Sequence, residues 1–106
     1  MTFKQPASIS EIIEHSRREP VIIFKYSSEC GTSSELARGL EKAVEKKAIP
    51  CPIYQITVQI KPTLSANIAE YFDITHETPQ IIILRNARVT YTAHHRNIKI
   101  RNFSFE

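Results

Sequence analysis

The chain has 106 residues, of which 42% are hydrophobic and 24% charged, and its formal net charge is +3 at pH 7. These totals exclude a disordered, collagenous or coiled-coil protein, and the length allows one domain with a modest core. The longest aliphatic runs are far too short to span a membrane, and the N-terminal MTFKQPASIS lacks the pattern of a signal peptide. We therefore expect a single domain over residues 1–106 that is located in the cytoplasm and has no membrane partner.

Basic residues dominate the C-terminal stretch, in which only Glu106 is acidic. A patch of this kind can bind an anion or a nucleic acid. None of the mixed basic and aromatic patterns of nucleic-acid modules accompanies it, which favours a solvated surface and no nucleic-acid partner. The basic residues of this stretch are Arg85, Arg88, Arg96, Lys99 and Arg101.

Helical and extended patterns alternate in the first half of the chain. Ser8, followed by isoleucines at helical spacing and by a glutamate at capping-box spacing, predicts a helix at 8–18. The β-branched and aromatic run at 21–26 is typical of a strand buried on both faces. Apolar residues at helical spacing predict the longest helix at 31–47, and alternating apolar and polar residues predict a strand at 54–60.

The second half ends in two strands rather than in a helix. Pro62 precedes a predicted helix at 63–72, which is followed by a buried strand at 81–84. Residues 89–93 alternate in polarity and predict a hairpin partner, and residues 96–106 favour an extended tail. A helix precedes each of the first three strands, so we expect an α/β fold with a mixed four-stranded sheet and helices on both faces.

Three segments together resemble the thioredoxin fold and, within it, the monothiol bacilliredoxins of the bacillithiol system. They are the strand PVIIFKYSSEC that ends in Cys30, the GTSS that follows, and ITHETPQIIIL. The resemblance covers roughly residues 8–95. It implies that Thr78-Pro79 has a cis peptide bond and lies beside the redox-active Cys30.

The chain departs from this family pattern at two places. Gly31 stands where many members carry a proline after the cysteine. The final RNIKIRNFSFE does not resemble the helix that usually closes the fold, so we expect that helix to be missing or replaced by an extended tail.

Cys30 stands where the longest helix begins, and this position favours a reactive thiol. The thiolate is the nucleophile in disulfide exchange, and a helix N-terminus offers unpaired amides and partial positive charge to stabilise it. The amides of Thr32 and Ser33, and the Ser33 hydroxyl, are placed to donate to the sulfur. Gly31 leaves room for an incoming disulfide.

Ser33 occupies the position at which a dithiol motif carries its second cysteine. A dithiol resolves its own mixed disulfide, whereas a lone Cys30 depends on a second molecule. The family resemblance implies a thiol–disulfide oxidoreductase that takes a small thiol from S-thiolated client proteins. Bacillithiol or a similar low-molecular-weight thiol is then the co-substrate and frees Cys30, and we expect neither a bound cofactor nor a metal.

The second cysteine, Cys51, lies between Pro50 and Pro52 beyond the far end of the longest helix. At 1.5 Å rise per residue the helix separates it from Cys30 by about 25 Å, far beyond the reach of a disulfide. We interpret Cys51 as a small, partly buried residue rather than a resolving thiol. The two cysteines fit no disulfide framework and no zinc spacing.

Five further residues have weaker claims on the site. Lys25 holds the carboxylate of a bound small thiol or raises the local positive potential, unless it is a surface lysine. Glu29 opposes the Cys30 thiolate electrostatically. His76 either approaches the site or is a loop residue. No spacing supports His94-His95 as metal ligands together with a cysteine.

Two alternative functions stay open at this stage. CGTS is similar to the CGFS motif of monothiol glutaredoxins, which carry a two-iron cluster between two subunits, although Thr32 replaces the phenylalanine. The chain could also be a thioredoxin-fold adaptor in which Cys30 is inert. A pKa of Cys30 at or above that of an ordinary thiol would favour the adaptor.

Overall fold

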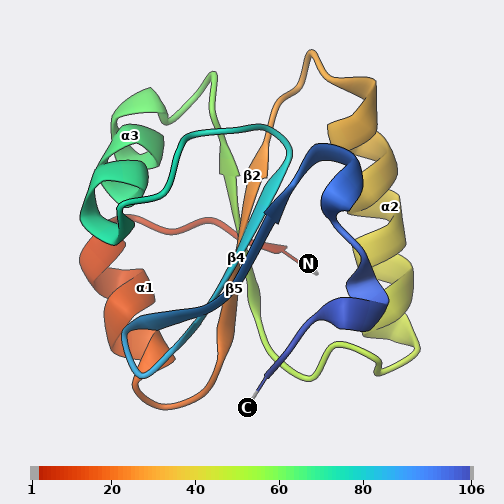
Figure 1. The fold of residues 1–106 in the computed structure, drawn as a ribbon, viewed down its shortest axis with the longest axis horizontal. Coiled ribbons are helices and arrows are strands. Elements are labelled where there is room, and N and C mark those ends of the chain that lie inside the picture. Colours follow the sequence, from red (N-terminus) through yellow and green to blue (C-terminus); the bar gives the residue numbers. More distant parts are fainter. Residues whose placement is uncertain (1–2, 106) are drawn as a thin grey trace.

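The structure, a computed structural model, describes residues 3–105 and has one mixed sheet between two helical layers (Figure 1). The ends of the predicted domain, Met1, Thr2 and Glu106, lie outside the described residues. The element order begins with β1 (Phe3–Lys4), α1 (Ile9–Ser16), β2 (Val21–Tyr26), α2 (Gly31–Glu45) and β3 (Ile53–Thr57). It continues with α3 (Pro62–Phe72), β4 (Gln80–Arg85), β5 (Arg88–His94) and the 3₁₀ turns η1 (His95–Asn97) and η2 (Ile100–Asn102).

The helices begin and end close to the predicted residues. Ser8 is the N-cap of α1, and its side chain accepts a hydrogen bond from the Glu11 amide. Pro62 occupies the first turn of α3, where its missing N–H costs nothing, and Asp73 closes the helix in the left-handed conformation. Residues 8–73 therefore follow the expected order.

The five strands run in the order β1-β3-β2-β4-β5. β3 is parallel to β1 and β2, whereas β4 is antiparallel to both β2 and β5. The last residues of β2, β3 and β5 consequently meet the first residue of β4 at one end of the sheet, which is the upper end in Figure 1. Loops far apart in sequence come together there.

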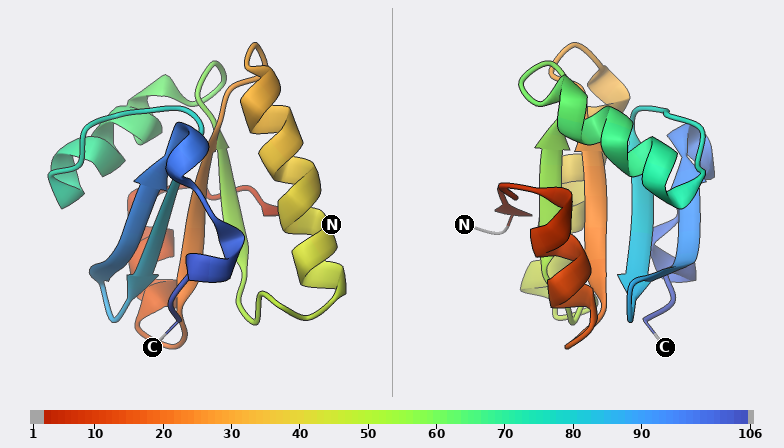
Figure 2. Two further views of the ribbon diagram at one scale, coloured as in Figure 1. Left: turned by 45° about the vertical axis from the view of Figure 1, so that its right-hand side comes forward. Right: turned by 90° about the vertical axis from the view of Figure 1, so that its left-hand side faces the viewer.

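Each face of the sheet has its own core. α1 and α3 cover one face, and α2 covers the other together with the C-terminal segment (Figures 1 and 2). Alternation along β2 divides its side chains between the two faces, since Ile22 and Phe24 join the α2 core while Val21 and Ile23 join the core under α1 and α3. The continuous apolar run in β2 thus reflects burial on both sides.

Two predictions for the sheet are corrected by the structure. The predicted four-stranded sheet has a fifth strand, β1, which covers two of the described residues, Phe3 and Lys4, and pairs with β3. The strand predicted at 54–60 ends at Thr57, because a turn follows in which Ile60 is 75% exposed. The alternating pattern continued past the strand and overstated its length.

The C-terminal segment is neither the closing helix nor an extended strand. It forms η1 and η2, and its apolar side chains pack against the core beside α2: Ile98, Ile100, Phe103 and Phe105. These side chains cover the face that a closing helix would cover. No helix within residues 3–105 is long and apolar enough to span a membrane.

Candidate active site at Cys30

Cys30 and Thr78-Pro79 belong to loops that meet at the same end of the sheet. In the register of β2 and β4, Lys25 faces Gln80, the first residue of β4, and β2 ends one residue later at Tyr26. Cys30 follows the end of β2, and Pro79 directly precedes β4. The thioredoxin-like juxtaposition of these two loops therefore follows from strand pairing.

Cys30 is the N-cap residue of α2, with extended backbone angles (φ −117°, ψ 114°). Its carbonyl accepts hydrogen bonds from the amides of Ser33 and Ser34 at 3.1 and 3.3 Å, which starts the helix. Gly31 is the first helical residue, and a methyl group placed on it would meet nothing within 4 Å. The fold therefore does not require glycine there, and Gly31 leaves the space beside Cys30 open. Proline, which many family members carry here, is also tolerated at the first position of a helix.

Ser33 is the main cause of the lowered pKa of Cys30. Its amide and its hydroxyl favour the thiolate most, partial burial opposes them, and Thr32 adds a smaller contribution in the same direction. Ser33 is fully buried, and its Oγ accepts a hydrogen bond from the Ser27 amide at 3.3 Å, which leaves its own proton free to point toward Cys30. The exposed Glu29 does not appear among the causes of the shift.

Gln59 fastens the loop before Cys30 and was missed by the sequence analysis. Its Nε2 donates to Ser27 Oγ at 2.7 Å, and its Oε1 accepts from the Ser28 amide at 3.2 Å. Gln59 follows β3, which lies parallel to β2, so the two strand ends place it beside the Cys30 loop. The parallel pairing was the only available signal, because Gln59 itself looks like any polar residue of an alternating strand.

The peptide bond between Thr78 and Pro79 is cis, as the resemblance implied. Thr78 is half-buried and Pro79 is buried at the start of β4. The Pro79 carbonyl accepts a hydrogen bond from the amide of His95 at 3.0 Å. The C-terminal segment is therefore held directly against the loop that carries this proline.

Comparison with known proteins agrees with this geometry. Residues 1–103 match the family model described as "Monothiol bacilliredoxin BrxC". The chain belongs to the monothiol bacilliredoxin family. One solved structure, described as having a thioredoxin fold, shares 22% identity at a TM-score of 0.79, and the match covers 94% of this chain and 88% of that one.

Two thioredoxins are also similar in fold. That of Fasciola hepatica has a TM-score of 0.63 at 13% identity, with 85% of this chain and 81% of that one covered. The oxidised thioredoxin of Plasmodium falciparum has a TM-score of 0.66 at 19% identity, with 87% and 84% covered. The bacilliredoxin family and the thioredoxin fold together support a thiol redox role for the chain.

Lys25 lies away from the thiol of this bacilliredoxin-family chain. It has the same parity along β2 as Val21 and Ile23, so its side chain enters the core under α3 and is completely buried. Its Nζ donates to the Ser65 carbonyl at 2.9 Å and lies 3.1 Å from His76 Nδ1. Burial lowers the pKa of Lys25 to about 8. Lys25 is therefore not a surface lysine, and none of its hydrogen bonds reaches Cys30.

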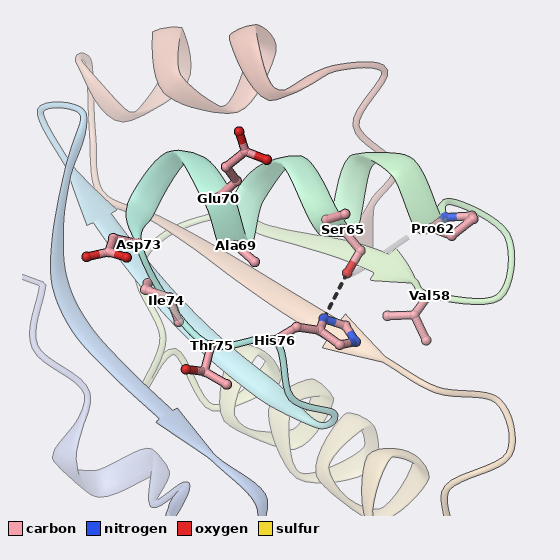
Figure 3. Close-up of a pocket in the computed structure, with 10 residues that line it drawn as sticks. Val58, Pro62, Ser65, Ala69, Glu70, Asp73, Ile74, Thr75 and His76 are labelled. Carbon is pink, nitrogen blue, oxygen red and sulfur yellow. Dashed lines mark hydrogen bonds between the residues drawn. The ribbon is translucent and has the colours of Figure 1, made fainter.

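His76, the hydrogen-bond partner of Lys25, lines a surface cavity of about 590 Å³ between α3 and the loop before β4 (Figure 3). Its Nδ1 accepts from Lys25 and lies 3.3 Å from Ser65 Oγ. Burial and then the neighbouring Lys25 charge lower the pKa of His76, against a smaller opposing effect of Glu77. The neutral imidazole is thus the form that fits beside a buried amine.

Cys51 lies at the other end of the sheet. It is two residues before β3, and the adjacent Pro52 carbonyl accepts a hydrogen bond from Ile22 near the start of β2. Both cysteines are free. Burial, followed by the charge of Glu19, raises the pKa of Cys51 to about 12. The separation agrees with our rejection of Cys51 as a resolving thiol.

His94 and His95 lie close to Glu77 rather than to a cysteine. The hypothesis that joined these two histidines to a thiol therefore does not match the arrangement of the side chains. Their own cluster is considered separately below.

Proposed function

We propose that the chain is a monothiol thiol–disulfide oxidoreductase that removes a low-molecular-weight thiol from S-thiolated proteins. The observation that carries the proposal is the pairing of Cys30 with Ser33. Ser33 lowers the pKa of the thiol and at the same time fills the place of a resolving cysteine. With Cys51 at the far end of the sheet, Cys30 has no internal partner to resolve its mixed disulfide.

In the first step, the Cys30 thiolate attacks the small-thiol sulfur of a client mixed disulfide. A disulfide forms between Cys30 and the small thiol, the original disulfide breaks, and the client leaves as a thiolate that takes a proton from water. In the second step, a second small thiol attacks as its thiolate and releases the small thiol from Cys30 as a symmetrical disulfide. The client cysteine is reduced to a thiol and the second small thiol is oxidised, while the small thiol taken from the client keeps its oxidation level and becomes the other half of the released disulfide.

The first turn of α2 has two tasks in this scheme. The Ser33 amide and hydroxyl, with help from Thr32, stabilise Cys30 as nucleophile in the first step and as leaving group in the second. Gln59 is a positioning residue, because it acts by holding the loop that carries Cys30. Thr78 and Pro79 form the opposing wall on which the disulfide of the client rests.

We propose bacillithiol or a thiol of similar size as the co-substrate, a choice that membership of the bacilliredoxin family supports. The partners are S-thiolated client proteins and that small thiol, and the reaction requires no bound cofactor. Two free cysteines suit a reducing compartment, so we place the reaction in the cytoplasm.

Mass spectrometry after incubation with oxidised bacillithiol and, in parallel, oxidised glutathione tests the proposal. We expect one thiol adduct per chain, located on Cys30 and favoured with bacillithiol. Cys51→Ser is the matched control and should be modified to the same extent as the natural chain. Modification of Cys51 in place of Cys30, or no adduct with either disulfide, would overturn the proposal.

A cluster-carrying function predicts a different result. Anaerobic incubation with iron and sulfide would then produce visible absorbance and a dimer, both of which Cys30→Ser should abolish. We expect neither, and a stable cluster in the natural chain would favour the glutaredoxin-like alternative.

A further inference from the structure

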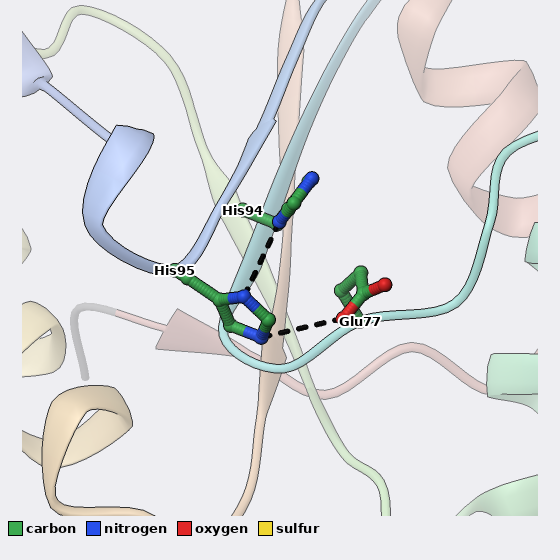
Figure 4. Close-up of side chains that lie close together, drawn as sticks. All are labelled: Glu77, His94 and His95. Atoms are coloured by element: carbon green, nitrogen blue, oxygen red, sulfur yellow. Dashed lines mark hydrogen bonds and ion pairs between the residues drawn. The ribbon is translucent and has the colours of Figure 1, made fainter.

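Glu77, His94 and His95 form a side-chain cluster at the edge of the Cys30 end of the sheet (Figure 4). Glu77 comes from the loop before Thr78, His94 ends β5, and His95 begins η1. One potential ligand atom from each residue lies within 4.8 Å of the other two. The cluster contains neither cysteine, and the thiol-exchange scheme does not use it.

The backbone at His95 brings both histidines to the same side. Consecutive side chains of a strand point to opposite faces, which would separate His94 from His95. His95 instead has φ 53°, in the left-handed region, which ends the strand alternation. The two imidazole rings lie 5.0 Å apart between centroids and meet edge to face, with the Nδ1 atoms 3.3 Å apart.

Glu77 sets the tautomer of His95 and thereby leaves a lone pair on the nitrogen that faces His94. A carboxylate oxygen of Glu77 lies 3.3 Å from His95 Nε2. Since an ionised carboxylate only accepts hydrogen bonds, Nε2 of a neutral His95 carries the hydrogen and Nδ1 carries the lone pair. A carboxylate that holds the outer N–H of a histidine is the usual second partner of a metal-binding imidazole.

The spacing of the two Nδ1 atoms suits a metal ion. Two nitrogens that each bind tetrahedral zinc at about 2.0–2.1 Å are about 3.3–3.4 Å apart. The observed separation is 3.3 Å. Imidazole nitrogen is a preferred ligand of zinc and its neighbours in the transition series, whereas Mg²⁺ prefers oxygen.

We propose that His94 and His95 bind Zn²⁺ through their Nδ1 atoms and that Glu77 holds His95 in the required tautomer. The hydrogen on His94 Nδ1 moves to its Nε2 when the metal binds, so no net proton is released, and water completes the coordination. Because the His95 amide also donates to Pro79, the metal would fasten the C-terminal segment to the loop beside Cys30. The site is independent of the proposed thiol chemistry.

Zinc titration of Cys30→Ser, in competition with a chromogenic chelator, tests this site without a contribution from the reactive thiolate. We expect one Zn²⁺ per chain and an affinity at least tenfold lower in the double variants that add His94→Ala or His95→Ala. Glu77→Ala should weaken binding by a smaller factor, and Mg²⁺ should not compete. His76→Ala is the matched control, since it removes a histidine outside the cluster and should leave the affinity unchanged.

The NMR signals of the imidazole rings give a readout that does not depend on affinity. Zinc should shift the ring signals of His94 and His95 in Cys30→Ser and leave those of His15 and His76 in place. Circular dichroism of each metal-free variant checks that it is folded, and His94→Asn replaces His94→Ala if that variant is not. Zinc affinity that survives loss of both histidines, or the absence of any zinc binding by Cys30→Ser, would overturn the proposal.

Discussion

The two ends of the sheet shift the pKa of a cysteine in opposite directions. At one end, hydrogen bonds from the first turn of α2 lower the pKa of Cys30. At the other end, burial and the charge of Glu19 raise the pKa of Cys51 to about 12. Neither cysteine forms a disulfide, so the opposite pKa shifts come from the surroundings of each sulfur. Hydrogen-bond donors stabilise the thiolate of Cys30, whereas mainly apolar surroundings disfavour the thiolate of Cys51.

The same helix separates these two environments. Cys30 caps the start of α2, where amides point outward, whereas Cys51 follows its end, where carbonyls do. Proline on both sides of Cys51 also removes amides that could have donated to a thiolate. Thiol reactivity in this chain thus depends on position relative to a helix rather than on the number of cysteines.

Replacing each cysteine in turn should have the largest effect. Cys30→Ser should abolish removal of a small thiol from a client protein, because serine cannot form the mixed disulfide. Cys51→Ser should keep the natural rate. Measuring release of a labelled small thiol from a client protein by both variants checks this. A Cys51→Ser variant as inactive as Cys30→Ser would contradict the claim that only Cys30 reacts.

Ser33→Ala should produce the next largest effect, since it removes the hydroxyl contribution and leaves the amide. We expect the pKa of Cys30 to rise and its alkylation at neutral pH to slow by up to about tenfold, because the thiolate fraction falls. The difference should disappear at a pH above the raised pKa. Stopped-flow alkylation as a function of pH measures both.

Ser34→Ala is the control for this experiment. Ser34 lies in the same turn, but its hydroxyl faces Tyr26 at 3.3 Å rather than Cys30. Equal pKa values of Cys30 in Ser33→Ala and in the natural chain would show that the hydroxyl does not act on the thiol.

Gln59→Ala should have a smaller effect on Cys30. The variant loses two hydrogen bonds to the loop before Cys30, so we expect about 1 kcal/mol less stability and a rate that falls a fewfold, with little change in the pKa of Cys30. Gln55→Ala, which removes a hydrogen bond only to Thr57, is the matched control. Identical rates for the two variants would mean that the hydrogen bonds of Gln59 do not position the loop before Cys30.

Lys25→Met should have the smallest effect on the thiol and a distinctive effect on stability. The pKa of Lys25 is 10.5 in an ordinary environment and about 8 in the fold, so between these values the unfolded chain binds a proton that the folded chain does not. The stability of the natural chain relative to Lys25→Met should therefore rise from pH 8 toward pH 10.5.

Denaturant unfolding of both proteins across that pH range measures the effect, together with the pKa of Cys30. A stability difference that is flat with pH would contradict the lowered pKa of Lys25. A shift in the pKa of Cys30 would show that Lys25 reaches the thiol after all.

Periodicity and turn residues were sufficient to predict the order of helices and strands from 8 to 93, and the placement of Cys30 at a helix start. The cis peptide bond at Thr78-Pro79 came from the family resemblance. β1 could not be predicted, because two residues have no periodicity and depend on pairing with β3. No closing helix was predicted for the C-terminal segment and none is present in residues 96–105, but the extended tail was wrong, because apolar residues at spacing two also suit 3₁₀ turns whose side chains reach one core.

The supporting residues of the site were harder to predict than Cys30 itself. Gln59 contacts the Cys30 loop only because two parallel strands end side by side, which is a property of the assembled sheet. The direction of Lys25 was available from its parity with Val21 and Ile23, which place it on the face away from α2. Glu77 and the two histidines converge because the backbone at His95 is left-handed, and no local sequence pattern predicts that conformation.

Differential alkylation of the native protein over a range of pH, read out by mass spectrometry for each cysteine, tests the contrast between Cys30 and Cys51 most directly. The account predicts that Cys30 reacts at a pH below that of an ordinary thiol, and that Cys51 stays unmodified until the protein is unfolded. Modification of Cys51 before Cys30, or a Cys30 that reacts only at the pH of an ordinary thiol or above, would contradict it.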